Sequence, residues 1–252
     1  MLIKHRMKNY WSARAKGYSQ LIKEEISSFK KDAWKKLISE NAGQSGNIKA
    51  LDIGTGPGFF ALLMAELGYN VTAVDSSENM LLEARQNAEN AGLSIKFVKA
   101  DVHKLPFSDN SFDLIVCRNL VWTLINPRDA YKEWYRVLSK NGKLIIFDAN
   151  WYLRLSDASL QEKYEQSQKA AEAMGYKSPL SKEQQIEYEN IAKNLPLSYE
   201  VRPDWDKKAL LECGFQKVIV YNDISCKIWS ELEQIRYSTS PMFLVCAYKI
   251  ES

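Results

Sequence analysis

The chain of 252 residues is 46% hydrophobic and 26% charged, which is ordinary for a soluble globular protein and excludes a disordered chain, a collagen-like fibre and a small disulfide scaffold. Its net charge of +3 gives no basic footprint for nucleic acid. No apolar run approaches the roughly 18 residues of a membrane span, and no apolar stretch follows the basic residues near the start as in a secretory signal. Four scattered cysteines indicate reduced, mostly buried thiols. We therefore expect a cytoplasmic protein whose partners are neither nucleic acid nor membrane.

Residues 1–46 are predicted to form a helical cap on the rest of the chain. Apolar side chains from Tyr18 to Ile38 recur there at roughly helical spacing. A stretch rich in glycine, serine and asparagine, from Asn41 to Asn47, predicts a break after these helices.

From Ile48 to Asn150 the pattern changes to short apolar strands that alternate with helices. The predicted strands are Ile48–Ile53, Val71–Val74, Ile95–Val98, Phe112–Cys117 and Leu144–Phe147. The predicted helices between them are Gly58–Leu67, Asn79–Asn90 and Pro127–Leu138. Such alternation is typical of an α/β fold with a doubly wound, mostly parallel sheet covered on both faces. Ligands bind to such a sheet at the carboxyl ends of its strands.

Residues 151–200 interrupt this alternation with two amphipathic helices. Gly175 ends the first helix, and Ser181 with Gln184 forms a capping-box pattern that opens the second. The α/β pattern then resumes with a helix over 205–213 and strands over 217–221 and 242–248. We expect one domain over 47–252, with the 151–200 insertion lying over the ligand edge either as a mobile lid or as a permanently docked or dimer-forming segment.

A glycine-rich turn, Gly54-Thr55-Gly56-Pro57-Gly58, follows the first strand, which ends in Asp52-Ile53. Glycine lets a ligand lie against the backbone, and the amides at the following helix start favour acceptor groups. Dinucleotide sites use the spacing G-x-G-x-x-G, whereas the third glycine here comes one residue earlier. No lysine of a phosphate-binding P-loop follows the turn.

The next three strands also end in polar groups. Asp75, at the end of the second strand, can accept hydrogen bonds from two ribose hydroxyls. Asp101 and Val102 follow the third strand and combine a polar with an apolar group, which suits an adenine ring. Asn119 follows the fourth strand. Four such strand ends favour a binding site over a merely structural turn.

These segments resemble the class I S-adenosylmethionine-dependent methyltransferases, and in particular their small-molecule branch, type 11. The resemblance rests on Asp52–Gly58, Asp75, Ala100–Val102, Leu105–Phe107 and Phe112–Asp113. It covers about residues 10–150 and loosely the final strand pair, but not the insertion. It implies a Rossmann-like sheet of seven strands with the last one antiparallel. It also implies S-adenosyl-L-methionine as cofactor, S-adenosyl-L-homocysteine as product, and a small-molecule N, O or S nucleophile as methyl acceptor.

The resemblance further implies that the glycine turn lies beside the methionine moiety of the cofactor and that Asp75 binds the ribose. It also implies that Asp101 and Val102 contact the adenine and that Asn119 lies beneath the sulfonium. Tyr18 either closes over the cofactor or packs in the helical core. The residues expected to bind the cofactor are Tyr18, Asp52, Gly54, Thr55, Gly56, Gly58, Asp75, Ser76, Met80, Asp101, Val102 and Asn119.

Methyl transfer from a sulfonium is an in-line displacement, so the protein mainly aligns the reactants and excludes water. We expect no dedicated catalytic side chain, although His103 is either a general base or an ordinary loop histidine. The sequence after the fourth strand lacks the proline pair of DNA amine methylases. No metal-ligand spacing is present, with Asp148 and Asn150 leaving a faint alternative.

Four aromatic side chains are expected to border the methyl acceptor: Trp11, Trp122, Trp151 and Tyr152. They form either an apolar or cation-binding pocket or a packing contact for the insertion. Two other functions stay open. One is a nicotinamide-dependent oxidoreductase, against which the glycine spacing and Asp52 argue, and the other is a non-catalytic cofactor-binding protein.

Overall fold

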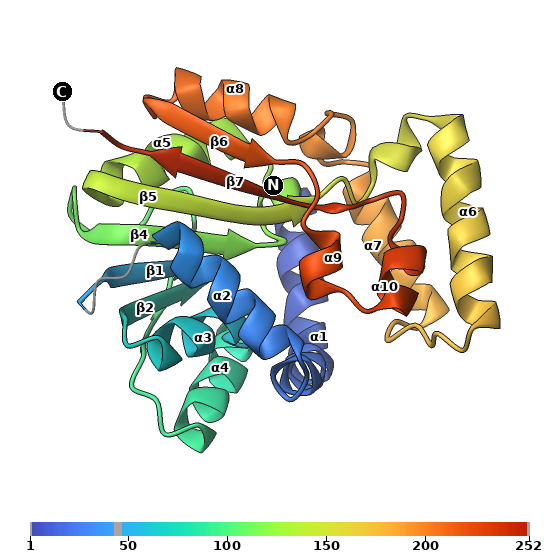
Figure 1. Cartoon of the computed structure of the whole chain (residues 1–252), viewed down its shortest axis with the longest axis horizontal. Coiled ribbons are helices and arrows are strands. Elements are labelled where there is room, and N and C mark those ends of the chain that lie inside the picture. Colours follow the sequence, from blue (N-terminus) through green and yellow to red (C-terminus); the bar gives the residue numbers. More distant parts are fainter. Residues whose placement is uncertain (1, 43–46, 251–252) are drawn as a thin grey trace.

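A computed structural model describes residues 2–42 and 47–250 of the chain. Its centre is a seven-stranded sheet in the order β3-β2-β1-β4-β5-β7-β6 (Figure 1). The strands are β1 (Lys49–Ile53), β2 (Asn70–Asp75), β3 (Lys96–Lys99), β4 (Phe112–Arg118), β5 (Leu138–Ala149), β6 (Lys217–Tyr221) and β7 (Met242–Tyr248). Strands β1 to β5 pair in parallel, and β7 runs antiparallel to both β5 and β6. The predicted doubly wound sheet and its antiparallel last strand are confirmed.

Helices cover both faces of this sheet. The helices are α1 (Leu2–Ile26), α2 (Lys30–Ala42), α3 (Phe59–Glu66), α4 (Glu78–Asn90), α5 (Pro127–Val137), α6 (Ala158–Ala173), α7 (Lys182–Ala192), α8 (Asp204–Glu212), α9 (Ser225–Ile228) and α10 (Glu231–Arg236). Three single 3₁₀ turns join them: η1 (Val121–Thr123), η2 (Leu153–Leu155) and η3 (Pro196–Ser198). Helices α2, α3 and α9 share one buried cluster with the sheet, and α5 and α8 share the other.

Large aromatic side chains fill the core on each face. Trp34 of α2 packs edge-on against Phe147 of β5, with ring centroids 5.1 Å apart. On the opposite face, Tyr131 and Trp134 of α5 are fully buried beside Phe215. Because both faces of the sheet are covered, its strands read as continuous apolar runs rather than alternating ones.

The insertion lies beyond the carboxyl ends of the parallel strands, where α6 and α7 stand beside α1 and α10 (Figure 1). Tyr188 of α7 stacks on Tyr10 of α1 at 4.6 Å between ring centroids. Arg6 and Glu187 form a half-exposed ion pair at 2.7 Å across the same two helices. The predicted capping box of Ser181 and Gln184 opens α7.

Several details differ from the sequence-based expectations. Strand β5 begins at Leu138, six residues before the apolar run that predicted it. The short helices α9 and α10 were not predicted. Cys117 and Cys246 are buried as expected, whereas Cys226 is exposed. The predicted break after the N-terminal helices lies largely outside the described residues, because α2 ends at Ala42 and residues 43–46 are not described. Among the helices described, none has the length and apolar character needed to cross a membrane.

Candidate functional site

The glycine turn joins β1 to α3 in a conformation that only glycine adopts readily. Gly56 has φ +53°, and Gly58, which precedes α3, has φ +93°. A Cβ atom on Gly58 would lie 3.2 Å from the Cβ of Ala84 in α4, so this glycine permits close packing of the two helices. A Cβ atom on Gly56 would instead point toward the ring of Tyr18, 3.5 Å away. Gly56 therefore faces the space above the turn, whereas Gly58 faces the protein.

Asp52 lies beneath the turn and binds to the turn itself. Its buried carboxylate accepts hydrogen bonds from the Thr55 hydroxyl at 2.6 Å and from the Ala61 amide at 2.9 Å. Burial raises the pKa of Asp52 to about 7, against the lowering effect of these two hydrogen bonds. Asp52, Thr55 and Gly58, which were expected to bind the cofactor, are not among the residues that line the two cavities described below. Their role toward the cofactor stays a prediction.

Asp75 is placed by two backbone amides at the end of β2. One carboxylate oxygen accepts from the Gly56 amide at 3.0 Å and the other from the Ser77 amide at 2.8 Å. Burial raises the pKa of Asp75 despite these bonds. Each oxygen keeps a further lone pair for a ligand hydroxyl, because an ionised carboxylate can accept about four hydrogen bonds. Ser77 caps α4, while the adjacent Ser76 lines the same cavity as Asp75.

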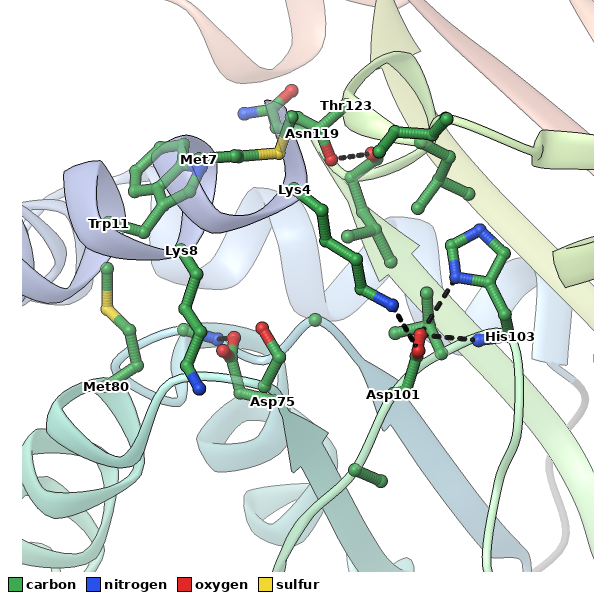
Figure 2. Close-up of a pocket in the computed structure, with 18 of the residues that line it drawn as sticks. Lys4, Met7, Lys8, Trp11, Asp75, Met80, Asp101, His103, Asn119 and Thr123 are labelled. Atoms are coloured by element: carbon green, nitrogen blue, oxygen red, sulfur yellow. Dashed lines mark hydrogen bonds and ion pairs between the residues drawn. The ribbon is translucent and has the colours of Figure 1, made fainter. Parts of the chain in front are cut away.

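The third strand end is closed by helix α1. Figure 2 shows Lys4 reaching from α1 to Asp101, and the two form an ion pair at 2.6 Å. His103 binds the same carboxylate through its backbone amide at 3.1 Å and its ring Nδ1 at 2.8 Å. Burial alone would raise the pKa of Asp101, but the hydrogen bonds from Lys4 and His103 lower it to about 2. In the same view Lys8 extends from α1 toward Asp75.

A first cavity of about 540 Å³ lies between α1 and the strand ends. The predicted residues that line it are Tyr18, Gly54, Gly56, Asp75, Ser76, Met80, Asp101, Val102 and Asn119. His103 lines this cavity too, and its buried Nε2 has no hydrogen-bond partner among the described residues. Arg118 also reaches the cavity, but Glu25 of α1 binds its guanidinium at 2.7 Å.

A second cavity of about 330 Å³ adjoins the first and is lined by α1, the insertion and the end of α10. The four aromatic residues predicted to border the acceptor, Trp11, Trp122, Trp151 and Tyr152, all line it. Trp11, Tyr18 and Asn119 line both cavities and so mark their junction. Asn119 adopts φ +54°, and its buried Oδ1 has no hydrogen-bond partner within the described chain.

A buried ion network supports the wall of the second cavity. Asp148 at the end of β5 binds Arg202 at 2.7 Å, and Arg202 binds Asp206 of α8 at 2.8 Å. Asp148 also accepts hydrogen bonds from the Trp122 amide at 3.1 Å and the Trp151 indole at 3.2 Å. In residues 2–42 and 47–250 no three His, Cys, Asp or Glu side chains gather as metal ligands, and Asp148 is committed to Arg202.

Sequence reasoning missed several residues of these cavities, including Lys4, Tyr188 and Arg236. Lys4 lies in the N-terminal helix, where only Trp11 and Tyr18 were predicted to border the site. Tyr188 contacts Tyr10, Trp11, Trp122 and Tyr152, and it is the centre of the aromatic cluster. Arg236 lies in the unpredicted helix α10. The only available signal was the capping-box pattern of Ser230 and Glu233, which opens α10.

Comparison with known proteins supports this fold. Residues 51–146 match the family described as "Methyltransferase domain". The demethylmenaquinone methyltransferase of Thermus thermophilus is 32% identical over 117 residues, which cover 46% of this chain and 53% of the relative. The match thus spans about half the length of this relative, and of two further curated relatives.

Solved structures share the fold at low sequence identity. A Methanococcus maripaludis protein superposes with a TM-score of 0.63 at 22% identity, covering 96% of this chain and 94% of that one. Phosphoethanolamine N-methyltransferase 2 of Haemonchus contortus, solved with S-adenosyl-L-methionine, has a TM-score of 0.61 at 18% identity and covers 86% of this chain and 52% of its own. Residues 51–146 thus match a methyltransferase domain family, and the chain as a whole shares the fold of solved S-adenosylmethionine-dependent methyltransferases.

Proposed function

We propose that this protein transfers a methyl group from S-adenosyl-L-methionine to a small-molecule acceptor. The observation that carries the proposal is the pair of adjoining cavities at the carboxyl edge of the sheet, which meet at Trp11, Tyr18 and Asn119. One cavity would hold the cofactor and the other the acceptor, so that the methyl group crosses at their junction.

The residues of the first cavity fit an adenosine-containing cofactor. The turn at Gly54 and Gly56 presents backbone without side chains, which permits close approach. Asp75 is held by two amides, with lone pairs left for ribose hydroxyls. The unpartnered Oδ1 of Asn119 offers an acceptor at the junction, where the cationic end of the cofactor would lie.

When bound, the cofactor supplies a methyl group made electrophilic by its sulfonium charge. The chain then needs to align the acceptor and keep water out, which Trp11 and Tyr18 would do at the junction. Among the described residues of the second cavity, no histidine or aspartate is available as a base. Glu189 is paired with Arg154, and His103 lines only the first cavity. We therefore assign catalysis to positioning rather than to a general base.

The acceptor atom is best sought among activated nucleophiles. The aromatic lining of the second cavity suits a flat molecule. Oxygen, nitrogen and sulfur nucleophiles all react by in-line displacement, and the name of the Thermus thermophilus relative adds demethylmenaquinone as a further kind of acceptor.

Titration calorimetry with S-adenosyl-L-homocysteine and with NADH tests the cofactor. We expect only the former to bind, and Asp75→Ala to weaken its binding tenfold or more through loss of charge-assisted hydrogen bonds. Asp113→Ala is the matched control, because Asp113 also accepts a backbone amide, from Lys49, but lies outside both cavities.

Transfer of labelled methyl groups to panels of thiols, amines, phenols and carboxylates tests the activity. Binding of NADH alone would favour an oxidoreductase. Binding of S-adenosyl-L-homocysteine without turnover of any acceptor would instead indicate a non-catalytic cofactor-binding protein.

A further inference from the structure

More positively than negatively charged side chains line the second cavity. Among its lining residues that the structure describes, the charged ones are Arg14, Arg154, Arg236 and Glu189. Three guanidinium groups thus face one carboxylate in a space otherwise lined largely by aromatic rings and amide or hydroxyl groups.

The single carboxylate is already used by its neighbours. Glu189 binds Arg154 at 2.9 Å and also Lys193 at 3.3 Å. Arg154 is further fixed by the side chain of Gln161 at 2.7 Å. Glu189 therefore neutralises Arg154 and leaves nothing for the other two arginines.

Arg236 and Arg14 have no carboxylate within ion-pair distance in the described part of the chain. The guanidinium of Arg236 lies 4.7 Å from the ring centroid of Tyr176, and its buried Nε has no hydrogen-bond partner within residues 2–42 and 47–250. The guanidinium of Arg14 lies 5.8 Å from the ring of Trp11 and 5.9 Å from that of Tyr18. Rings hold both groups in place without cancelling their charge.

A half-buried guanidinium without an anion is unfavourable unless a ligand supplies one. Arginine matches carboxylate and phosphate groups by planar, two-pronged hydrogen bonding. The aromatic rings around it suit a flat body, and about 330 Å³ is enough only for a small molecule.

We infer that the second cavity binds a small, flat acceptor that carries a carboxylate or phosphate group, with Arg236 and Arg14 as its anion-binding side chains. This inference rests on the proposed function, since it names the acceptor class of the same site. It disfavours the cation-binding alternative considered from the sequence, because three guanidinium groups repel a cationic acceptor. The inferred acceptor also differs in charge from a neutral quinone or quinol.

Calorimetric titration of the full chain, with and without saturating S-adenosyl-L-homocysteine, tests the inference. The probes are benzoate, phenyl phosphate, benzamide and benzylamine, which share one ring and differ in charge. We expect at least one anion to bind tenfold or more tightly than benzamide, and benzylamine to bind least. The stronger of the two anions identifies the group as carboxylate or phosphate.

Variants assign the effect to named side chains. Arg236→Gln and Arg14→Gln should each weaken anion binding at least tenfold and leave benzamide binding unchanged. Arg128→Gln is the matched control, because Arg128 lies on α5 outside both cavities and is paired with Glu212. Binding of S-adenosyl-L-homocysteine should be unaffected by Arg236→Gln, which also shows that this variant is folded.

Equal binding of benzamide and both anions by the wild-type chain would overturn the inference without any variant. Tighter binding of menadiol than of either anion would overturn it in favour of a neutral acceptor. Failure of S-adenosyl-L-homocysteine to bind would overturn the proposed function instead, while the titrations without it still measure the anion preference.

Discussion

Replacing Gly56 by alanine tests whether the glycine turn serves a ligand or only the fold. In the left-handed region an alanine costs about 1–2 kcal/mol, and Gly56 has φ +53°. The added methyl would meet the ring of Tyr18 at 3.5 Å, which is an ordinary contact, so no further cost to folding is expected. The methyl would, however, occupy space in the first cavity. We expect the affinity for S-adenosyl-L-homocysteine to fall at least tenfold, equivalent to about 1.4 kcal/mol.

Gly68→Ala provides the matched control. Gly68 has φ +83°, and a Cβ atom there would meet no atom within 4 Å, so alanine meets a similar backbone strain at a position that lines neither cavity. Urea unfolding should show a comparable loss of stability in the two variants, and calorimetry should show loss of binding in Gly56→Ala only. Native affinity in Gly56→Ala would refute the view that a ligand lies against this turn.

Two further predictions concern stability and dynamics. The folded pKa of Asp52 is about 7 and its unfolded pKa about 3.8, so the folded state holds the proton more tightly between these values. The free energy of unfolding should therefore fall by about 4 kcal/mol as pH rises from 4 to 8. Asp52→Asn, measured by urea unfolding, should remove most of this dependence of stability on pH. An equal pH dependence in the wild-type chain and the variant would contradict the raised pKa of Asp52. Amide hydrogen exchange over residues 158–192 should slow when S-adenosyl-L-homocysteine fills the first cavity, because α7 packs on α1 and α1 lines that cavity. Exchange that is unaffected by the ligand would mean that the insertion is permanently docked and is not a lid.

The strands and the glycine turn were predictable because their signals are local. A buried strand appears in the sequence as a short apolar run. The strands predicted over 217–221 and 242–248 begin and end at the same residues as the observed β6 and β7. Strand β5 begins earlier than predicted because Leu138 pairs with Phe112 across a break in its apolar pattern, at Ser139–Gly142. Pairing with the neighbouring strand β4 extends β5 through residues that are not apolar.

The roles of individual turn residues were less predictable. Spacing identified the turn, but it does not say which side each residue faces. Gly56 faces a cavity, whereas Asp52, Thr55 and Gly58 hold the turn from below. The part played by Arg236 could not be read from the sequence at all, because it depends on contact between segments about sixty residues apart in the chain.

The shared wall of the two cavities has a consequence for how acceptor preference can change in evolution. Tyr10 and Trp11 of α1 contact Tyr188 of the insertion, so the acceptor chamber is made by two segments that lie on either side of the family match over residues 51–146. Exchange of the insertion alone between relatives would break this aromatic contact. Inheritance of a new preference therefore requires the N-terminal helix and the insertion to change together, while the strand ends that hold the cofactor stay the same.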